Sequence, residues 1–239
     1  MTINSKRTAI LASAAVTALS VVASLLVTYF LAEGDSFKRG VIPATIVPLT
    51  VAPLACAWSF SQTLRIHRLN RRLEFLLNHD TLTQLHSRAF FFDKTTSDTG
   101  FSVAVTLMVD ADHFKSINDT HGHDVGDMAL CHIAGVLREN CRQDDIVARL
   151  GGEEFVVYMR NANVELGSSV AERIRNALEQ TPLLAGDARI NLTVSIGLAT
   201  RIPSADIDAV LKKADEALYA AKASGRNRVV IADEIATRH

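Results

Sequence analysis

Two long stretches without charged side chains, near the start of the chain, most constrain how it can fold. They cover residues 9 to 32 and residues 41 to 64. A helix needs about 20 apolar residues to cross a bilayer, so each stretch is long enough to span one. The second stretch contains prolines, which a membrane span tolerates better than a soluble helix does. We therefore expect residues 1 to 64 to form a two-span transmembrane hairpin.

The flanking charges favour this interpretation over a cleaved signal peptide. Lys6 and Arg7 precede the first stretch, as in a signal peptide, but its apolar core is longer and a second stretch follows at once. The loop between the stretches balances two acidic with two basic residues. Basic residues follow the second stretch, namely Arg65, His67, Arg68, Arg71 and Arg72. The positive-inside rule then places both termini in the cytoplasm.

A short heptad-like pattern follows the second stretch. Ile66, Leu69, Leu73 and Leu76 recur at spacings of three and four, with arginines between them. This spacing is typical of a parallel coiled coil between two copies, and we expect a signalling linker over residues 65 to 78. A single amphipathic helix that packs on its own domain is the alternative.

The sequence pattern of residues 79 to 239 predicts one α/β domain. Apolar runs of strand length alternate with segments of helical periodicity. Helices are expected at 87–95, 125–140, 164–180 and 207–223, and strands at 101–109, on both sides of Gly151-Gly152, at 190–200 and at 229–231. The pattern indicates a mixed five-stranded sheet flanked by helices. A net charge of -1 gives no reason to expect a nucleic-acid partner.

Acidic residues occur at two points where expected strands end. Asp110 and Asp112 follow the first long apolar run, and Glu153 and Glu154 follow the glycine pair in RLGGEEF. Carboxylates at such edges suit Mg²⁺, which prefers oxygen ligands. Taken singly, each has another interpretation, since a strand-end Asp can cap a helix and the glutamates can sit on a solvated hairpin tip.

Polar side chains crowd the segment between these acids. Asn118 and Asp127 offer donors and acceptors that match a purine edge, and Lys115 could neutralise phosphate. A polar loop held by Asx turns is the alternative. Farther along, Arg142 could bind a guanine edge or phosphate, and Asp145 could accept from purine N–H groups. An ordinary surface ion pair at i,i+3 is the alternative.

Together these segments resemble the GGDEF family of diguanylate cyclases. HDTLTQL, DADHFKSINDTHGHDVGD, RLGGEEF, LTVSIGLA and ADEALYAAKASGRN occur in the family's order and cover nearly all of residues 79 to 231. The resemblance implies a fold similar to nucleotide cyclases and polymerase palms. It also implies that a homodimer in the bacterial inner membrane condenses two GTP into cyclic di-GMP, releases two pyrophosphates and is inhibited by its product.

Residue roles follow from the same resemblance. Metal ligands for Mg²⁺ or Mn²⁺ would be Asp110, the carbonyl of Ala111, and Glu153. Substrate-binding residues would be Phe114, Lys115, Asn118, His123, Asp127, Gly151, Gly152, Lys222 and Arg226. Lys115 would also stabilise the transition state, Glu154 would deprotonate the 3′-hydroxyl, and Arg142 with Asp145 would form the inhibitory site.

Departures from the family pattern are few. Gln84 and Ser87 in LTQLHSR replace the usual glycine and asparagine, and both lie outside the expected metal and phosphate positions. A catalytically silent receptor for GTP or cyclic di-GMP is the alternative function. A purely structural membrane dimer is a third, although so complete a polar set would serve no purpose there.

Overall fold

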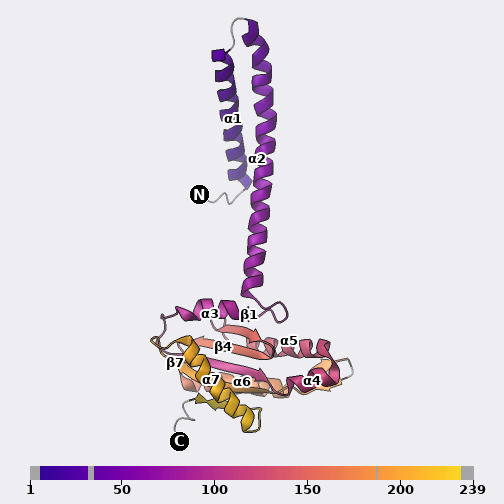
Figure 1. The fold of residues 1–239 in the computed structure, drawn as a ribbon, viewed down its shortest axis with the longest axis vertical. Coiled ribbons are helices and arrows are strands. Elements are labelled where there is room, and N and C mark those ends of the chain that lie inside the picture. Colours follow the sequence, from indigo (N-terminus) through magenta and orange to yellow (C-terminus); the bar gives the residue numbers. More distant parts are fainter. Residues whose placement is uncertain (1–5, 32–34, 187, 233–239) are drawn as a thin grey trace. The chain divides into compact units, whose positions relative to one another are not determined.

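The computed structural model of this 239-residue chain describes residues 6–31, 35–186 and 188–232. The chain divides into two compact units, Met1–Leu73 and Glu74–His239. The first unit contains α1 (Lys6–Leu31) and most of α2 (Asp35–Asn78). Figure 1 shows the elements of each unit in sequence colours.

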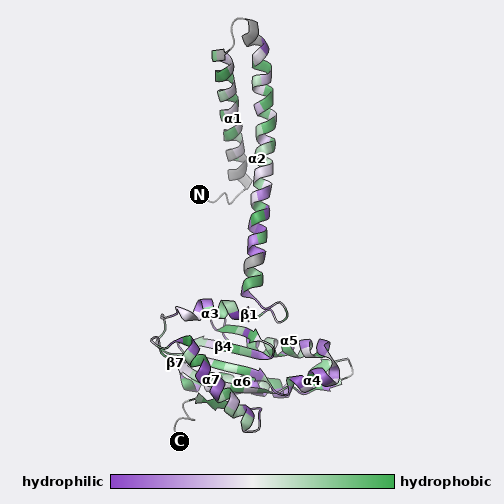
Figure 2. Cartoon of the chain, viewed as in Figure 1, coloured by the Kyte–Doolittle hydropathy of each residue, from purple (hydrophilic) through white to green (hydrophobic). Residues whose placement is uncertain are grey.

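Two helices are long and apolar enough to cross a membrane, within Ser13–Phe30 and Arg39–Asn78. Apolar residues cover most of their length (Figure 2). Threonine hydroxyls in these helices donate to backbone carbonyls one turn earlier, for example Thr17 to Ser13 at 2.8 Å. Such bonds satisfy polar groups without water, as a bilayer requires. The helix α2 continues through Pro43, Pro48 and Pro53.

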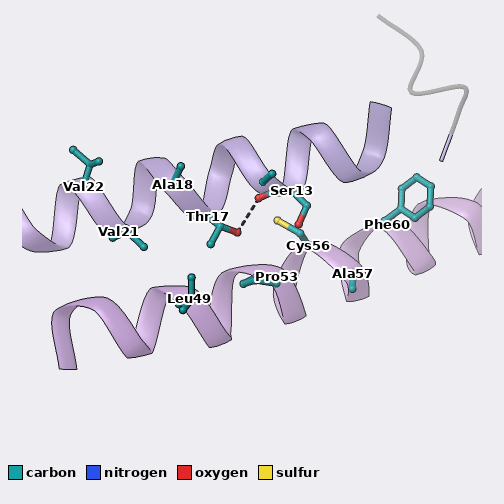
Figure 3. Close-up of a pocket in the computed structure, with 11 residues that line it drawn as sticks. Ser13, Thr17, Ala18, Val21, Val22, Leu49, Pro53, Cys56, Ala57 and Phe60 are labelled. Carbon is teal, nitrogen blue, oxygen red and sulfur yellow. Dashed lines mark hydrogen bonds between the residues drawn. The ribbon is translucent and has the colours of Figure 1, made fainter. Parts of the chain in front are cut away.

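A hollow of about 970 Å³ lies between α1 and α2. Figure 3 shows small and apolar side chains around it, together with the Thr17 hydroxyl that donates to Ser13. Its lining includes Ala18, Pro53 and Cys56 and contains no charged side chain. Phosphate chemistry needs cationic partners, so this hollow is not a candidate for that chemistry.

The second unit is built on a six-stranded mixed sheet with the order β1-β3-β4-β2-β7-β8. Every residue of the central strand β2 is buried, as the sequence predicts for a strand covered on both faces. β2 pairs antiparallel with β4 and β7, whereas β1–β3 and β7–β8 are parallel pairs. The strand bounds are His86–Ser87 (β1), Ala104–Ala111 (β2), Ile146–Gly151 (β3), Glu154–Arg160 (β4), Val194–Arg201 (β7) and Val229–Ile231 (β8).

Helices cover both faces of this sheet (Figure 1). Alternate residues of β2 divide between two cores, because successive side chains of a strand point to opposite faces. Val105, Leu107 and Val109 belong to one core, while Ala104 and Met108 belong to the other. The first core contains residues of α4 (Phe114–His121), α5 (His123–Asn140) and α6 (Val164–Gln180), and the second contains residues of α3 (Arg88–Thr96) and α7 (Ile207–Ala223).

The helix α7 lies directly against β7 at Gly197. A Cβ at this glycine would stand 2.0 Å from the Ala214 carbonyl oxygen and 2.3 Å from the Leu218 nitrogen. Real Cβ atoms do not approach that closely, so only glycine permits this packing. Farther along the same helix, Lys222 contacts Asp110 at the end of β2.

The structure confirms the predicted mixed α/β fold and adds detail to it. The five expected strands are present, together with the two-residue β1 and a separate hairpin of β5 (Leu183–Ala185) and β6 (Ala188–Ile190). The polar segment after β2 also forms a helix, α4, which the sequence analysis left without a secondary-structure assignment. Short elements of this kind carry too few residues to show a periodic pattern.

Candidate active site

Asp110 lies buried at the end of β2 and has one paired and one unpaired carboxylate oxygen. Oδ2 is 2.8 Å from Nζ of Lys222, at the end of α7. Oδ1 is buried and has no hydrogen-bond partner among the described residues. Burial raises the pKa of Asp110, although the ion pair with Lys222 opposes that shift. An orphaned carboxylate oxygen of this kind fits a place for a cation.

The RLGGEEF segment forms the turn between β3 and β4. Gly152 has a φ of +54°, which glycine adopts without strain. Its carbonyl accepts hydrogen bonds from Arg149 Nε at 2.9 Å and Nη2 at 2.7 Å. Arg149 Nη1 also contacts Asp80 Oδ1 at 3.0 Å. One guanidinium thus fixes the turn and ties it to the start of the domain.

The two glutamates of the turn occupy different environments. Glu153 precedes β4 and is half-buried, and its carbonyl accepts from the Ala111 N–H at 3.4 Å. Burial raises the pKa of Glu153, and the neighbouring charge of Asp110 raises it further. Glu154 is the first residue of β4, is exposed, and has its Cα opposite that of Asp110.

The residues present fit a hard divalent cation. Glu153 and Asp110 repel each other electrostatically, and the buried Asp110 Oδ1 lacks a partner within the described part of the chain. No cluster of three or more His, Cys, Asp or Glu side chains converges there in the described residues. Asp110 and Glu153 supply two carboxylates, which would leave positions for water and phosphate, as is usual for Mg²⁺.

The residues expected to hold the base and sugar lie on α4 and α5. The Asn118 amide packs against Gly126, where a Cβ would stand 1.9 Å from its Oδ1. His123 and Asp127, in the first turns of α5, are exposed. These three side chains therefore belong to two adjoining helices, with Asn118 held in place by packing and the others free of the core.

Phe114 and Lys115 begin α4, and only one of them presents its side chain to solvent. The ring of Phe114 is buried in the core, whereas Lys115 is exposed. A contact between Phe114 and a triphosphate could therefore involve only its backbone N–H. The first N–H groups of a helix lack partners within it and attract anions.

Arg142 and Asp145 line a cavity of about 490 Å³ together with His79, His86 and Arg138. The Arg142 backbone N–H donates to Asp145 Oδ2 at 2.8 Å, and the Asp145 N–H donates to the Arg142 carbonyl at 3.1 Å. Both bonds use the backbone of Arg142, so its guanidinium does not take part in them. The exposed guanidinium of Arg142 thus remains available at the rim of the cavity.

Comparison with known proteins assigns the family. The family model "Diguanylate cyclase, GGDEF domain" matches residues 77–228. The chain belongs to the GGDEF family. Its match includes the end of β2, α4, the glycine turn, α7 and the loop as far as residue 228, which together carry the expected metal and phosphate residues.

Similar proteins support this assignment. The chain is 35% identical over 171 residues to "Diguanylate cyclase A" of Treponema denticola, covering 68% of this chain and 46% of that protein. The chain spans less than half the length of the curated relatives it matches.

Solved structures of the family share the fold. The coiled coil and GGDEF domain of DgcB from Caulobacter crescentus, in complex with c-di-GMP, matches with a TM-score of 0.70 and 29% identity. That match covers 74% of this chain and 97% of the other. A structure titled as the active GGEEF domain of a diguanylate cyclase from Vibrio cholerae matches at 33% identity and a TM-score of 0.50, covering 54% and 83%.

Two supporting residues were not predicted from the sequence. Arg149 and Asp80 hold the glycine turn. They lie 69 positions apart, and the local sequence around each residue does not predict their contact. Asp112 also differs from the expectation of a metal-suited carboxylate, since its oxygens accept hydrogen bonds from Thr193 and Ser195. Only the folded sheet brings these partners together.

Proposed function

We propose that the chain is a membrane-anchored diguanylate cyclase of the GGEEF type. It condenses two GTP into cyclic di-GMP and releases two pyrophosphates. The observation that carries the proposal is the buried Asp110: one oxygen pairs with Lys222, the other has no partner among the described residues, and its charge acts on Glu153. Such an arrangement suits a cation and a phosphate chain at the same edge of the sheet.

The proposed roles of the residues come from the resemblance to the family, and their positions are compatible with those roles. Asp110, the Ala111 carbonyl and Glu153 bind Mg²⁺ or Mn²⁺, which when bound neutralises phosphate charge and lowers the pKa of the attacking hydroxyl. Lys115 at the start of α4 and Lys222 with Arg226 at the end of α7 bind the triphosphate. Phosphoryl transfer depends mainly on such positioning and charge neutralisation.

The other proposed site residues bind the guanine and ribose of GTP and act on its 3′-hydroxyl. Asn118, His123 and Asp127 bind guanine and ribose, and the bare backbone of Gly151 and Gly152 lets GTP lie close. Glu154 takes the proton of the 3′-hydroxyl. The 3′-oxygen attacks the α-phosphate of the second GTP, and pyrophosphate leaves. The exposure of Glu154 supports this role, because a base must reach the substrate.

Each protomer supplies one half of the reaction centre, so turnover requires a homodimer. The linker over residues 65 to 78 presents Ile66, Leu69 and Leu76 largely exposed, which supports pairing with a second copy. The hairpin over residues 1 to 64 anchors the protein in the inner membrane, and the cyclase domain over residues 79 to 239 lies in the cytoplasm.

Product inhibition acts through Arg142 and Asp145. The cavity that they line also contains Arg138, so two guanidinium-bearing residues and a carboxylate face one space. Arg binds phosphate or a guanine edge bidentately, which suits cyclic di-GMP. We expect Arg142→Ala to relieve inhibition by added cyclic di-GMP at least about tenfold while leaving initial turnover intact.

The test uses the full chain in detergent with GTP and Mg²⁺, with cyclic di-GMP and pyrophosphate measured over time. One cyclic di-GMP should form for every two pyrophosphates. Binding of GTP or cyclic di-GMP without turnover would instead identify a silent receptor. Failure to bind either nucleotide would leave only a structural role.

A further inference from the structure

Asp112 lies two residues after Asp110, just past the end of β2. Its buried carboxylate accepts hydrogen bonds from neutral donors. Its Oδ1 accepts from Ser195 Oγ at 2.7 Å. Its Oδ2 accepts from Thr193 Oγ1 at 2.8 Å and from the Asn227 backbone N–H at 3.0 Å. The bond to Asn227 joins the end of β2 to the loop that follows α7.

That loop has a backbone that needs support. Arg226 and Asn227 have φ values of +58° and +45°, in the left-handed region. This conformation costs about 1 kcal/mol or more for each residue other than glycine, so surrounding bonds must hold it. Asn227 is held at its side chain as well, by Glu179 Oε1 at 2.8 Å and Arg175 Nη1 at 3.0 Å.

The loop begins next to the cation site. Lys222 lies in the last turn of α7 and contacts Asp110, and Arg226 follows in the loop. The Arg226 N–H donates to the Ala221 carbonyl at 3.1 Å, which folds the loop back on the helix. Asp112 accepts the hydrogen bond that joins this loop to the end of β2. One buried carboxylate therefore fixes the distance between the loop and the strand.

We infer that Asp112 is a positioning residue for triphosphate recognition, which fixes the backbone of residues 226 and 227 so that Arg226 meets the terminal phosphates. The inference rests on the proposed function. Asp112 touches neither metal nor substrate in this role. Its effect should therefore fall on ligands that carry β- and γ-phosphates and spare those without them.

The experiment measures binding of a non-hydrolysable GTP analogue and of GMP, each with Mg²⁺, to the full chain in detergent. Asp112→Ala should weaken binding of the analogue about tenfold or more, since a buried hydrogen bond to a charged group is lost. Binding of GMP should change less than about threefold. Asp112→Asn should behave nearly as wild type, because Ser195 Oγ can accept from the new amide.

Two further variants separate the interpretations. Asn227→Gly keeps both the backbone N–H and the left-handed conformation, and it should lose less than Asp112→Ala. In a double-mutant cycle, Asp112→Ala and Arg226→Ala should be clearly non-additive on binding of the analogue, because they act through one contact. Thr193→Val removes one of the donors to the Asp112 carboxylate and is used if Asp112→Ala does not fold. This milder variant should also weaken binding of the analogue more than binding of GMP.

Two outcomes would overturn the inference, and a third would bear on the proposed function alone. Equal losses for the analogue and for GMP would indicate general damage to the site. An Asp112→Asn variant as weak as Asp112→Ala, with a raised Mg²⁺ requirement, would identify Asp112 as a metal ligand. A wild-type chain that binds GTP but makes no cyclic di-GMP would refute the proposed function and leave the ratio of the two affinities still measurable.

Discussion

Lys222 stands beside Asp110 as the cation that this buried carboxylate requires. Replacing it with methionine keeps the apolar stem and removes the charge, so Asp110 becomes an unpaired buried acid. We expect Lys222→Met to lower the metal-free stability by about 1 kcal/mol at pH 8, a figure reduced because the lysine is partly exposed. The measurement is urea unfolding of the full chain, and Lys213→Met on the exposed part of α7 is the control.

The pH dependence of this loss has a definite sign. Losing Lys222 raises the pKa of Asp110 in the folded protein still further above its unfolded value. The folded acid then favours its protonated form, so stability falls as pH rises through the raised pKa. The difference between Lys222→Met and wild type should shrink from pH 8 to pH 5. A difference independent of pH would contradict the ion pair.

At the scale of elements, four rings stack between the end of α2 and the GGDEF domain. Phe75 lies in the last turn of α2, His79 directly follows this helix, His86 belongs to β1 and Phe90 to α3. Their successive ring centroids are 4.4, 4.9 and 3.8 Å apart. Burial lowers the pKa of His86, and the neighbouring His79 lowers it further. Arg138, Arg142 and Asp145 line the cavity beside this stack.

We predict that acidification weakens this junction. A histidine whose folded pKa is lowered contributes stability above its unfolded pKa, near 6.5, and loses it as pH falls below that value. His86→Phe keeps the stack and removes the titrating group. The melting temperature of wild type should therefore drop more than that of His86→Phe between pH 7.5 and 5.5. Parallel curves would show that folding does not lower the pKa of His86.

The contact between α7 and β7 gives a second prediction at this scale. Gly197→Ala should cost about 3 kcal/mol or more, because the new methyl group would overlap backbone atoms of α7. Displacing α7 should also separate Lys222 from Asp110. Gly135→Ala on α5 is the matched control, since its Cβ meets nothing within 4 Å and helix propensity should make it neutral or slightly stabilising. Similar melting temperatures for both variants would contradict this packing.

For the whole molecule, activity should depend on pairing through the linker. Leu69→Gln with Leu73→Gln places polar groups on the expected seam, so dimer content and product formation should fall together, by about tenfold. Chemical cross-linking in detergent measures the dimer, and Arg68→Gln with Arg72→Gln on the same stretch is the control. A seam variant that stays dimeric and active would refute the linker's role.

Periodicity in the sequence predicted the long elements well. The bounds of α6 and α7 agree with expectation because each helix has a continuous apolar face. The ion pair of Lys222 with Asp110, the clamp of Arg149 on Gly152, and the bonds to Asp112 were not predictable. Each joins residues through tertiary packing and leaves no local periodic pattern. The separation of Glu153 from Glu154 likewise depends on where β4 begins.

The most direct measurement of the central claim is cyclic di-GMP formation from GTP and Mg²⁺ by wild type, Glu153→Ala and Glu165→Ala, each as the full chain in detergent. Glu165, an acidic residue in the first turn of α6, serves as the remote control. Wild type and Glu165→Ala should form product at similar rates. Glu153→Ala should lose at least about a thousandfold in turnover, because the cation loses one of its carboxylates. Product formation by Glu153→Ala at the wild-type rate would contradict the reaction centre proposed at this turn.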